Sequence, residues 1–352
     1  MSVLRVVLGT SGALASIAAS VACLGCNRSP SSAELDSWLA EARREDEALR
    51  AKVVASEAAT WSIAVRGNVA NGGSDYPWPK INALAKTHVK TTDPTHTSDV
   101  NAVLDYRGIL ISDLLDQSGA REEQGPGGAE VTIVAADGFL HARPLSDVKK
   151  FPILLAIERD GVPLVRKTGG PVLETMPHSS HPETKKIYAE GGAYYVTTLI
   201  VGTEPLALAV GGRTLRAADM PVLGERSVLG KAGFKFRWPS SPVKISGPRL
   251  RDVLAAANVP LRPGERVLVR RKSRTDTPER EVTTLRSDDV LACDVIIGLR
   301  YGDAHQLIPA TLGGPAVLAF SPACPKAANN QAWPMFVESI TVEAETDAGA
   351  KP

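Results

Sequence analysis

The sequence is poor in aromatic residues and in cysteine, and it has no excess of charge of either sign. Of its 352 residues, 5% are aromatic and four are cysteine, and 40 Lys and Arg side chains balance 39 Asp and Glu side chains. Binding to nucleic acid through bulk electrostatics needs a clear positive excess, so we expect no nucleic-acid partner. Beyond the N-terminal segment, no uninterrupted apolar run reaches the roughly 18 residues of a transmembrane helix, so we expect none in the mature chain.

Several common catalytic motifs are also missing. The sequence contains no G-x-G-x-x-G, P-loop, G-x-S-x-G or H-E-x-x-H motif, which excludes the usual dinucleotide, NTP, acyl-serine and zinc-protease sites. Glycine (30 residues) and proline (25 residues) are plentiful, and this composition favours many short strands joined by turns. The length suggests two domains.

The N-terminal segment has the pattern of an export signal. Arg5 precedes an apolar run that ends in small residues, so residues 1–25 are predicted to be a signal peptide. Cys26 follows Gly25 in a segment that resembles a bacterial lipobox, which predicts lipidation of Cys26; secretion without an anchor is the alternative. We therefore expect the protein in the bacterial cell envelope, either lipid-anchored and facing the periplasm or secreted, and in contact with the membrane through the lipid anchor only.

Residues 26–59 are predicted to form a spacer. Ser31 and Glu34 can form a capping box, and apolar residues between Leu35 and Val53 recur at spacings near three, four and seven. This pattern predicts an amphipathic helix from about residue 32 to 57. The helix would either hold the globular part away from a membrane or pack on the first domain.

The chain contains an internal repeat. Six features of its first part recur in the same order in its second part, at offsets of 139 to 145 residues. The matching segments are 65–67 and 210–212, 108–115 and 247–254, 145–148 and 285–290, 153–161 and 295–302, 169–171 and 313–315, and 194–201 and 335–342. Order and near-constant spacing indicate a tandem duplication. We assign residues 60–204 to a first copy, residues 205–346 to a second copy and residues 347–352 to a tail.

Each copy is predicted to be rich in strands, with short helices. In the first copy, alternation predicts strands over 61–67, 86–92, 129–135, 152–158, 172–176 and 194–201. Leu110, Leu114 and Leu115 are spaced as on one helical face, which predicts a helix over 109–118. The expected fold class is therefore α+β, mostly β.

These ordered landmarks resemble the oxidoreductase molybdopterin-binding domain family, which has the sulfite-oxidase fold. The family pattern is an opening V-x-G strand, a G-x-x-L-x-D-L-L helix, an Asp-Gly-aromatic segment, a strand ending in D/N-G, a G-G-P turn and a closing hydrophobic strand. In the first copy the corresponding segments are 65–67, 108–115, 137–139, 153–161, 169–171 and 195–201. The resemblance implies two tandem sulfite-oxidase-like domains after the helical spacer, although the second copy lacks the Asp-Gly-aromatic segment.

The sequence departs from the catalytic members of the family at one ligand. In those members a Cys thiolate ligates molybdenum from the loop before the G-x-x-L helix, whereas the corresponding segments here, 88–99 and 234–242, contain no Cys. Molybdenum would lose its strongest protein ligand, so we expect neither molybdenum nor an obligatory cofactor. The sequence looks more like short, Cys-free periplasmic members that carry a Thr-rich loop, some of which look like pterin-binding modules.

The first copy has the residues of a polar site, including five of the six histidines. Hydroxyl and imidazole groups can hydrogen-bond to the edge of a pterin, an aromatic ring can stack on it, and the family places a basic residue near the cofactor's phosphate. The predicted ligand-binding residues are Thr91, Thr92, His96, Asp137, Phe139 and Lys185. The alternative for each is an ordinary surface role, and no catalytic or metal-ligating residue is predicted. In the second copy, residues 234–238 alternate aromatic and basic side chains, which predicts a strand with one apolar face packed in the core; the alternative is an open face that contacts a partner or the first copy.

Two cysteines are left after signal removal and lipidation. In an oxidising envelope, Cys293 and Cys324 either form a disulfide or remain separate buried thiols.

Three functions follow from the observations on the whole sequence: a non-catalytic module for a pterin or related small ligand, an envelope scaffold for a protein partner, and a molybdopterin-dependent oxidoreductase. The missing ligand cysteine places the enzyme last.

Overall fold

A computed structural model describes residues 31–93, 99, 101–121, 130–188, 191–231, 238–272, 282–324 and 333–344. The signal segment, Cys26 and His96 lie outside these ranges. The chain divides into two units, residues 1–53 and residues 54–352.

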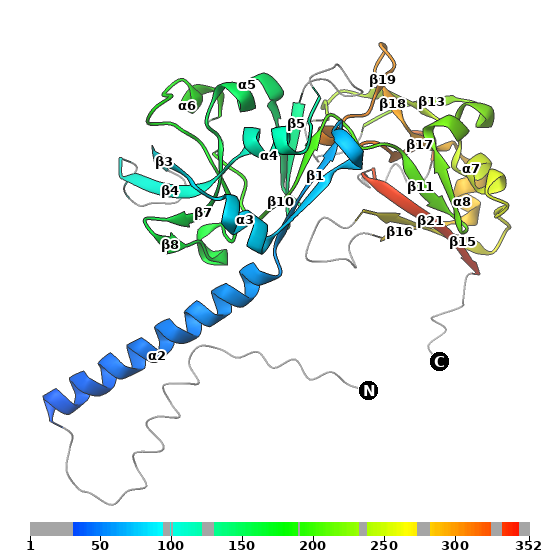
Figure 1. Ribbon diagram of the computed structural model, residues 1–352. Helices are drawn as coiled ribbons and strands as arrows, with labels where there is room; N and C mark the ends of the chain where they lie inside the picture. Colours follow the sequence, from blue (N-terminus) through cyan, green and yellow to red (C-terminus); the bar gives the residue numbers. More distant parts are fainter. Residues whose placement is uncertain are drawn as a thin grey trace, which may run out of the picture. The chain divides into compact units, whose positions relative to one another are not determined.

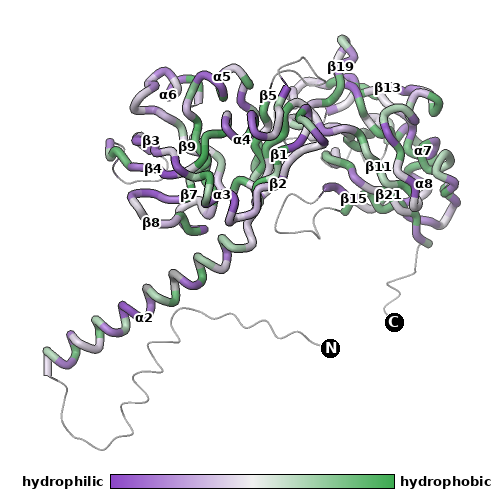
Figure 2. The backbone as a smooth tube through the Cα atoms, in the orientation of Figure 1, coloured by the Kyte–Doolittle hydropathy of each residue, from purple (hydrophilic) through white to green (hydrophobic). Residues whose placement is uncertain are grey.

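Helix α2 (Ser32–Ala59) supplies all the described structure of the first unit. It begins at a capping box, in which the backbone N–H of Ser31 donates to Glu34 over 2.7 Å and the N–H of Glu34 donates to the Ser31 hydroxyl over 3.3 Å. Along the helix, hydrophobic and hydrophilic residues alternate (Figure 2). Five of its large apolar side chains are exposed: Leu35, Trp38, Leu39, Leu49 and Val53. Within the described ranges, no helix is both long enough and apolar enough to span a bilayer.

The second unit is mixed α+β and consists mostly of strands with short helices, as expected from the composition (Figure 1). We call residues 60–204 the first half and residues 205–346 the second half. The first half contains β1 (Ser62–Gly67), β2 (Ser74–Pro77), α3 (Trp78–Leu84), β3 (Thr87–Thr92), β4 (Val103–Leu110), α4 (Ile111–Gln117), β5 (Glu130–Ala135), β6 (Leu140–Pro144), α5 (Leu145–Lys150), β7 (Leu154–Arg159), β8 (Val162–Pro163), β9 (Leu173–Thr175), α6 (Thr184–Ile187) and β10 (Val196–Val201).

The second half continues with shorter strands. Its elements are β11 (Ala207–Val210), β12 (Arg213–Arg216), β13 (Arg226–Gly230), β14 (Val243–Gly247), α7 (Leu250–Ala256), β15 (Glu265–Arg271), β16 (Val282–Arg286), α8 (Ser287–Ala292), β17 (Val295–Gly298), β18 (Arg300–Tyr301), β19 (Gln306–Leu307), β20 (Val317–Phe320) and β21 (Val337–Ala344).

The larger sheets of the two halves have corresponding strand orders. In the first half the order is β2-β1-β10-β5-β6, and in the second half it is β12-β11-β21-β15-β16. In both sheets the opening strand is parallel to the closing strand, β1 to β10 and β11 to β21, while the other pairs are antiparallel. The remaining strands form the sheet β3-β4-β7-β8, with β9 on β7, and in the second half the sheets β13-β14-β18-β19 and β17-β20.

Glycine is required at one corresponding position in each half. A Cβ atom at Gly108 would overlap the carbonyl of Leu155, and one at Gly247 would overlap the carbonyl of Ile297. The strands can approach this closely only because glycine has no side chain. Each half also contains a cis Gly-Pro peptide bond, before Pro171 and before Pro315.

The structure corrects one predicted helix boundary. Ile109 and Leu110 were expected to lie in a helix, but they pair with Leu155 and Leu154 of β7, and α4 begins only at Ile111. Ladder hydrogen bonds and burial in the sheet therefore override the helical spacing of the leucines.

In the second half, Trp238 is buried and its indole N–H donates to the carbonyl of Leu312 over 3.0 Å. This agrees with the predicted core packing for that residue, whereas residues 234–237 lie outside the described ranges.

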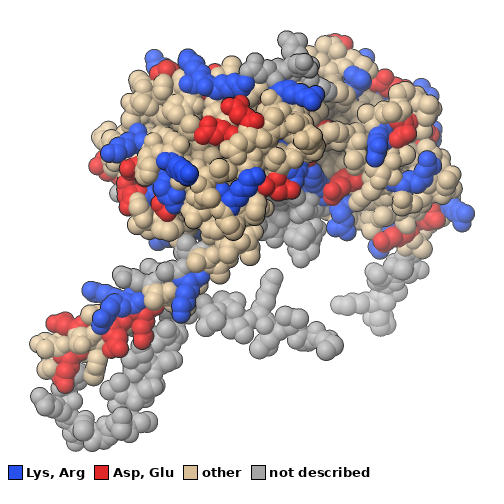
Figure 3. Space-filling view, in the orientation of Figure 1, with Lys and Arg blue, Asp and Glu red and all other residues tan. Residues whose placement is uncertain are grey.

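The two halves share buried surface. Val134, Leu140 and Ile200 of the first half belong to the same apolar cluster as the core of the second half. The backbone N–H of Ala310 also donates to the carbonyl of Gly202 over 3.0 Å. On the face shown in Figure 3, acidic and basic side chains are interspersed, in keeping with the balanced net charge.

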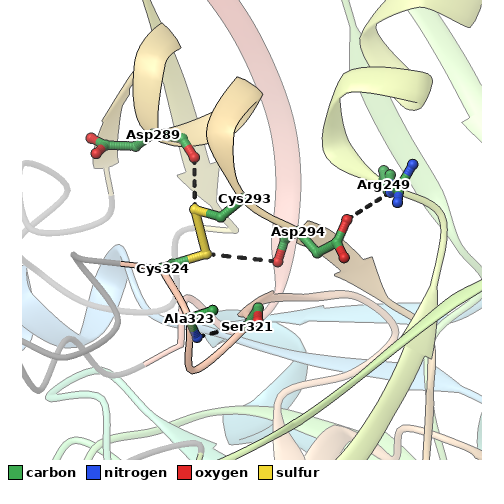
Figure 4. Close-up of a disulfide and its surroundings, with 7 residues drawn as sticks. All are labelled: Arg249, Asp289, Cys293, Asp294, Ser321, Ala323 and Cys324. Carbon is green, nitrogen blue, oxygen red and sulfur yellow. Dashed lines mark hydrogen bonds and ion pairs between the residues drawn. A yellow bond between two sulfur atoms is a disulfide. The ribbon is translucent and has the colours of Figure 1, made fainter.

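A disulfide joins Cys293 to Cys324 in the second half (Figure 4). Their Cα atoms are 5.5 Å apart, within the range that the bond allows. Beside it, Asp294 accepts a hydrogen bond from the Arg249 guanidinium over 2.7 Å. The bond joins residues 31 apart in the sequence, and cross-linking a loop of this length typically stabilises a fold by about 3–4 kcal/mol.

Candidate functional site

Buried ionisable side chains gather in the first half. Among the described residues, the buried charged or imidazole side chains are His141, Arg143, Glu174 and His178. The buried polar side chains described in the second half are only serine and threonine: Ser246, Ser287 and Thr311. A buried charge is costly unless it is paired. The contacts of these four residues therefore show which groups are paired and which still have a free hydrogen-bonding atom.

Glu174, on β9, is the centre of the first group and is 1% exposed. Its Oε1 atom accepts a hydrogen bond from Arg143 Nε over 3.0 Å, and its Oε2 atom lies 2.6 Å from His141 Nε2. Oε2 also accepts the backbone N–H of Ala193 over 2.9 Å. His141 and Arg143 are two residues apart on β6, and alternate residues of a strand project to the same face.

The two basic groups keep the Glu174 carboxylate ionised. Burial alone would raise the pKa of Glu174, but the charges of His141 and Arg143 and their hydrogen bonds outweigh burial and lower it to about 2. The first half therefore holds a negative charge in its interior at neutral pH.

Arg143 links this group to the segment that follows α6. Its guanidinium carbon lies 4.1 Å from the centroid of the Tyr188 ring, a cation–π contact. Its Nη2 atom donates to the carbonyl of Gly191 over 3.0 Å. The Tyr188 hydroxyl donates to Asp147, and burial together with this hydrogen bond raises the pKa of Tyr188.

His178 is the centre of a second group. Its Nδ1 atom lies 2.8 Å from the Thr184 hydroxyl, and that hydroxyl donates to the carbonyl of His181 over 2.6 Å. A hydroxyl has one proton, so His178 Nδ1 must be the donor to Thr184. Burial and the charge of Lys185 lower the pKa of His178, and the neutral ring is left with Nε2 as a hydrogen-bond acceptor.

The end of β3 lies beside this second group. The backbone N–H of Thr92 donates to the Ser179 hydroxyl over 3.1 Å. The next residue, Asp93, accepts a hydrogen bond from the Tyr106 hydroxyl over 2.7 Å and acts electrostatically on His178. Segments far apart in the sequence, 91–93 and 178–185, are thus brought together.

Three buried polar atoms in these groups have no hydrogen-bond partner within the described part of the chain. They are the hydroxyl oxygens of Thr92 and Thr175 and the Nδ1 atom of His141. Buried polar atoms without a protein partner are uncommon and call for a water molecule, a ligand or another explanation.

The predicted ligand-binding residues have different surroundings. Thr91 is 1% exposed and donates to the carbonyl of Thr92 over 3.3 Å, and Thr92 meets the segment that carries Lys185. Phe139 is 45% exposed, and its ring centroid lies 5.3 Å from that of His141 in an edge-on contact. Asp137 instead accepts the backbone N–H of Phe139 over 2.9 Å within the turn between β5 and β6.

Sequence reasoning missed the central charge. Glu174 and Arg143 were not among the predicted site residues, although they form the ionic core of the first half. A signal was present: Glu174 lies within the otherwise apolar or uncharged run 172–176. A lone charge in a buried strand requires a partner of opposite charge.

The second half replaces this ionic core with apolar side chains. In the first half, Arg143 of β6 pairs with Val131 of β5. At the corresponding place in the second half, Leu285 of β16 pairs with Val267 of β15. Likewise, Glu174 of β9 pairs with Leu155 of β7 in the first half. At the corresponding place in the second half, Leu318 of β20 pairs with Ile297 of β17. Leu285 and Leu318 are both fully buried, or nearly so.

Comparison with known proteins gives little support for any assignment. No protein-family model matches the chain, and no curated protein matches it. Among solved structures, the sulfane dehydrogenase SoxCD from Paracoccus pantotrophus is similar at 14% identity with a TM-score of 0.30, over 75% of this chain and 63% of that one. The chain therefore spans less than two thirds of that protein, and a similarity this distant assigns neither family nor activity.

We expect the free energy of unfolding of Glu174→Gln to fall less steeply with decreasing pH than that of the unmodified protein. Because the pKa of Glu174 is lowered from 4.5 to about 2, the stabilisation is complete above pH 4.5 and is lost as the pH falls towards 2. At 1.36 kcal/mol per pKa unit, it corresponds to roughly 3 kcal/mol. Urea unfolding between pH 7 and pH 2 measures the effect.

Glu183→Gln is the matched control, because this carboxylate is 48% exposed and lies 3.6 Å from His181. We expect the control to follow the acid dependence of the unmodified protein. An unchanged acid dependence in Glu174→Gln would contradict the buried ionic core.

Proposed function

We propose that this chain is an exported, non-catalytic binding protein whose first half takes a pterin or a chemically related small heterocycle. In this proposal the two halves, 60–204 and 205–346, are tandem domains of the sulfite-oxidase type. Residues 26–59 are the spacer that follows a lipid anchor at Cys26. The corresponding strand orders of the two large sheets support the tandem arrangement.

The observation that carries the proposal is the replacement of Arg143 and Glu174 by Leu285 and Leu318 at corresponding positions. Well-packed apolar residues often stabilise a fold as well as a buried ion pair does, or better. Since the second half builds a corresponding sheet with leucines, the strand arrangement does not require the ionic core. We infer that the first half keeps this ionic core to hold the segment 174–191, which carries the proposed binding groups His178 and Lys185.

The groups near His178 suit the edge of a pterin. Such an edge carries N–H donors beside carbonyl and ring-nitrogen acceptors. His178 Nε2 would accept a ring N–H, and the Thr92 hydroxyl, which has no partner among the described residues, would donate or accept. Lys185 is exposed on α6 and suits a phosphate or carboxylate substituent. The exposed ring of Phe139 offers a stacking surface.

The described residues do not fit molybdenum. Cys293 and Cys324 are joined to each other, so neither offers a thiolate. Within the described ranges, no three His, Cys, Asp or Glu side chains are grouped to hold a metal ion. The proposal therefore contains no molybdenum chemistry and no catalytic step.

A protein-binding scaffold is the second candidate function. The exposed apolar side chains along α2, among them Trp38 and Leu39, favour it, because an apolar stripe on a helix is a typical contact surface for a partner. Absence of pterin binding to the full chain in calorimetry would favour this candidate.

We expect the mature N-terminus to be an acylated Cys26. Intact-mass spectrometry of protein extracted from the native envelope should show the mass of lipid added to a chain that begins at this residue. Cys26→Ser should release the protein from the membrane fraction. Cleavage at another residue, or an unmodified Cys26, would contradict the anchor.

We expect the full chain to bind at least one of pterin, pterin-6-carboxylate and tetrahydrobiopterin in calorimetry, with Thr92→Val weakening binding. An unpaired group at a buried ligand edge costs about 1–3 kcal/mol, or roughly five- to a hundredfold in affinity. Valine keeps the shape of threonine and removes only the hydroxyl.

Thr311→Val is the matched control, since the Thr311 hydroxyl is also buried without a partner in the described structure but lies in the second half. We expect the control to bind with unchanged affinity. Equal loss in both variants, or no binding of any of the three compounds, would contradict the proposed site.

A further inference from the structure

A cavity of about 800 Å³ lies where the two halves meet. The first half contributes Gly67, Asn68, Thr203 and Glu204. The second half contributes the rest of the wall, including residues 246–248 and parts of the β18–β19 hairpin. Cavities of this size accommodate drug-sized organic molecules.

The wall of the cavity is mostly apolar. Its larger apolar side chains are Leu206, Met220, Leu299, Leu307 and Ile308, together with several prolines. All of these side chains belong to the second half, and they can cover the hydrocarbon or aromatic body of a ligand. The Thr203 hydroxyl, also in the wall, is buried without a hydrogen-bond partner in the described structure.

Both carboxylates of the wall have a basic partner within the protein. Glu225 lies 3.0 Å from His305 Nε2, and Glu204 lies 2.6 Å from Lys272 Nζ. The remaining charge in the wall is Arg300. Its Nη1 atom donates to the carbonyl of His305 over 3.1 Å, and no carboxylate pairs with it in the part of the chain that the structure describes. The guanidinium therefore keeps free donors for an anion.

The backbone around Arg300 is well fixed. Arg300 pairs with Leu307 across the β18–β19 hairpin, and the hydrogen bond between Ala310 and Gly202 holds the adjoining segment to the first half. The Arg300 side chain is exposed, and its hydrogen bond to the carbonyl of His305 restricts the guanidinium, which reduces the entropy lost on binding.

We propose that this cavity binds an apolar organic anion: a hydrocarbon or aromatic body with one carboxylate, sulfonate or phosphate group. Arg300 binds the anionic group through its free N–H donors, and the apolar wall covers the body. The site shares no residue with the groups around Glu174 and His178, so it stands or falls independently of pterin binding.

The test uses two fluorescent probes of the same aromatic framework on the full chain. 8-Anilinonaphthalene-1-sulfonate carries a sulfonate, and N-phenyl-1-naphthylamine lacks it. We expect saturable binding of one sulfonate probe per chain, with the neutral probe bound about tenfold more weakly or worse because it lacks the charge-assisted hydrogen bonds. Arg300→Gln should weaken the sulfonate probe by about tenfold and leave the neutral probe unchanged, whereas Arg300→Lys, which keeps the charge but loses the guanidinium fork, should weaken the sulfonate probe less than Arg300→Gln does.

Two further variants make the result specific. Arg213→Gln is the matched control, because Arg213 is exposed and also donates to one backbone carbonyl, that of Ala256, but does not line the cavity. Ala217→Trp places a large side chain in the wall and should block both probes while thermal unfolding stays cooperative. Equal affinity for the two probes, or the same affinity in Arg300→Gln and Arg213→Gln, would overturn the proposal.

Discussion

The carboxylate of Glu174 organises the interior of the first half, because it is the counter-charge for two basic side chains that lie on another strand. His141 and Arg143 reach it from β6, and the backbone of Ala193 closes the far side. Removal of the carboxylate would leave the two basic groups without a buried acid among the described residues. Breaking a buried ion pair in this way typically destabilises a fold by about 3–5 kcal/mol. The carboxylate therefore ties β6, β9 and the segment before β10 into one unit.

The second half fills the corresponding interior positions with uncharged side chains. Leu285 and Leu318 occupy the corresponding register positions, and a disulfide links the segment before β17 to the turn after β20. Its interior is thus held by apolar packing and a covalent link. The difference gives the two halves different chemistry. Among the described residues, the first half has most of the buried hydrogen-bonding side chains, whereas the second contributes an apolar wall and the Arg300 guanidinium to the cavity at the junction.

Much of this fold could be predicted from local patterns. Alternation located β1, β3, β5, β7 and β10 to within about two residues, and the two G-G-P segments both form turns in which the first glycine, Gly169 or Gly313, has a positive φ. The α3 helix was missed because its seven residues, 78–84, are too few to show a helical period. The start of α4 was misplaced because pairing with β7 keeps Ile109 and Leu110 extended.

The site was harder to predict than the fold. Arg143 and Glu174 are 31 residues apart in the sequence, so no local pattern could pair them, and only the isolated charge in an apolar strand marked Glu174. The tautomer of His178 depends on Thr184 and on the carbonyl of His181, which meet only after the turn has folded. Thr92 and Lys185 were predicted from their chemistry, but the hydrogen bond that brings β3 to Ser179 is a tertiary contact.

The central claim is that the first half, and not the second, binds a polar heterocycle through the groups around Glu174 and His178. Hydrogen–deuterium exchange of the full chain with and without pterin-6-carboxylate tests it most directly, because it locates the protected backbone. The account predicts slower exchange in residues 87–93 and 174–188, with no change in the corresponding strands β13 and β20 of the second half. Protection confined to the second half, or equal protection in both halves, would contradict it.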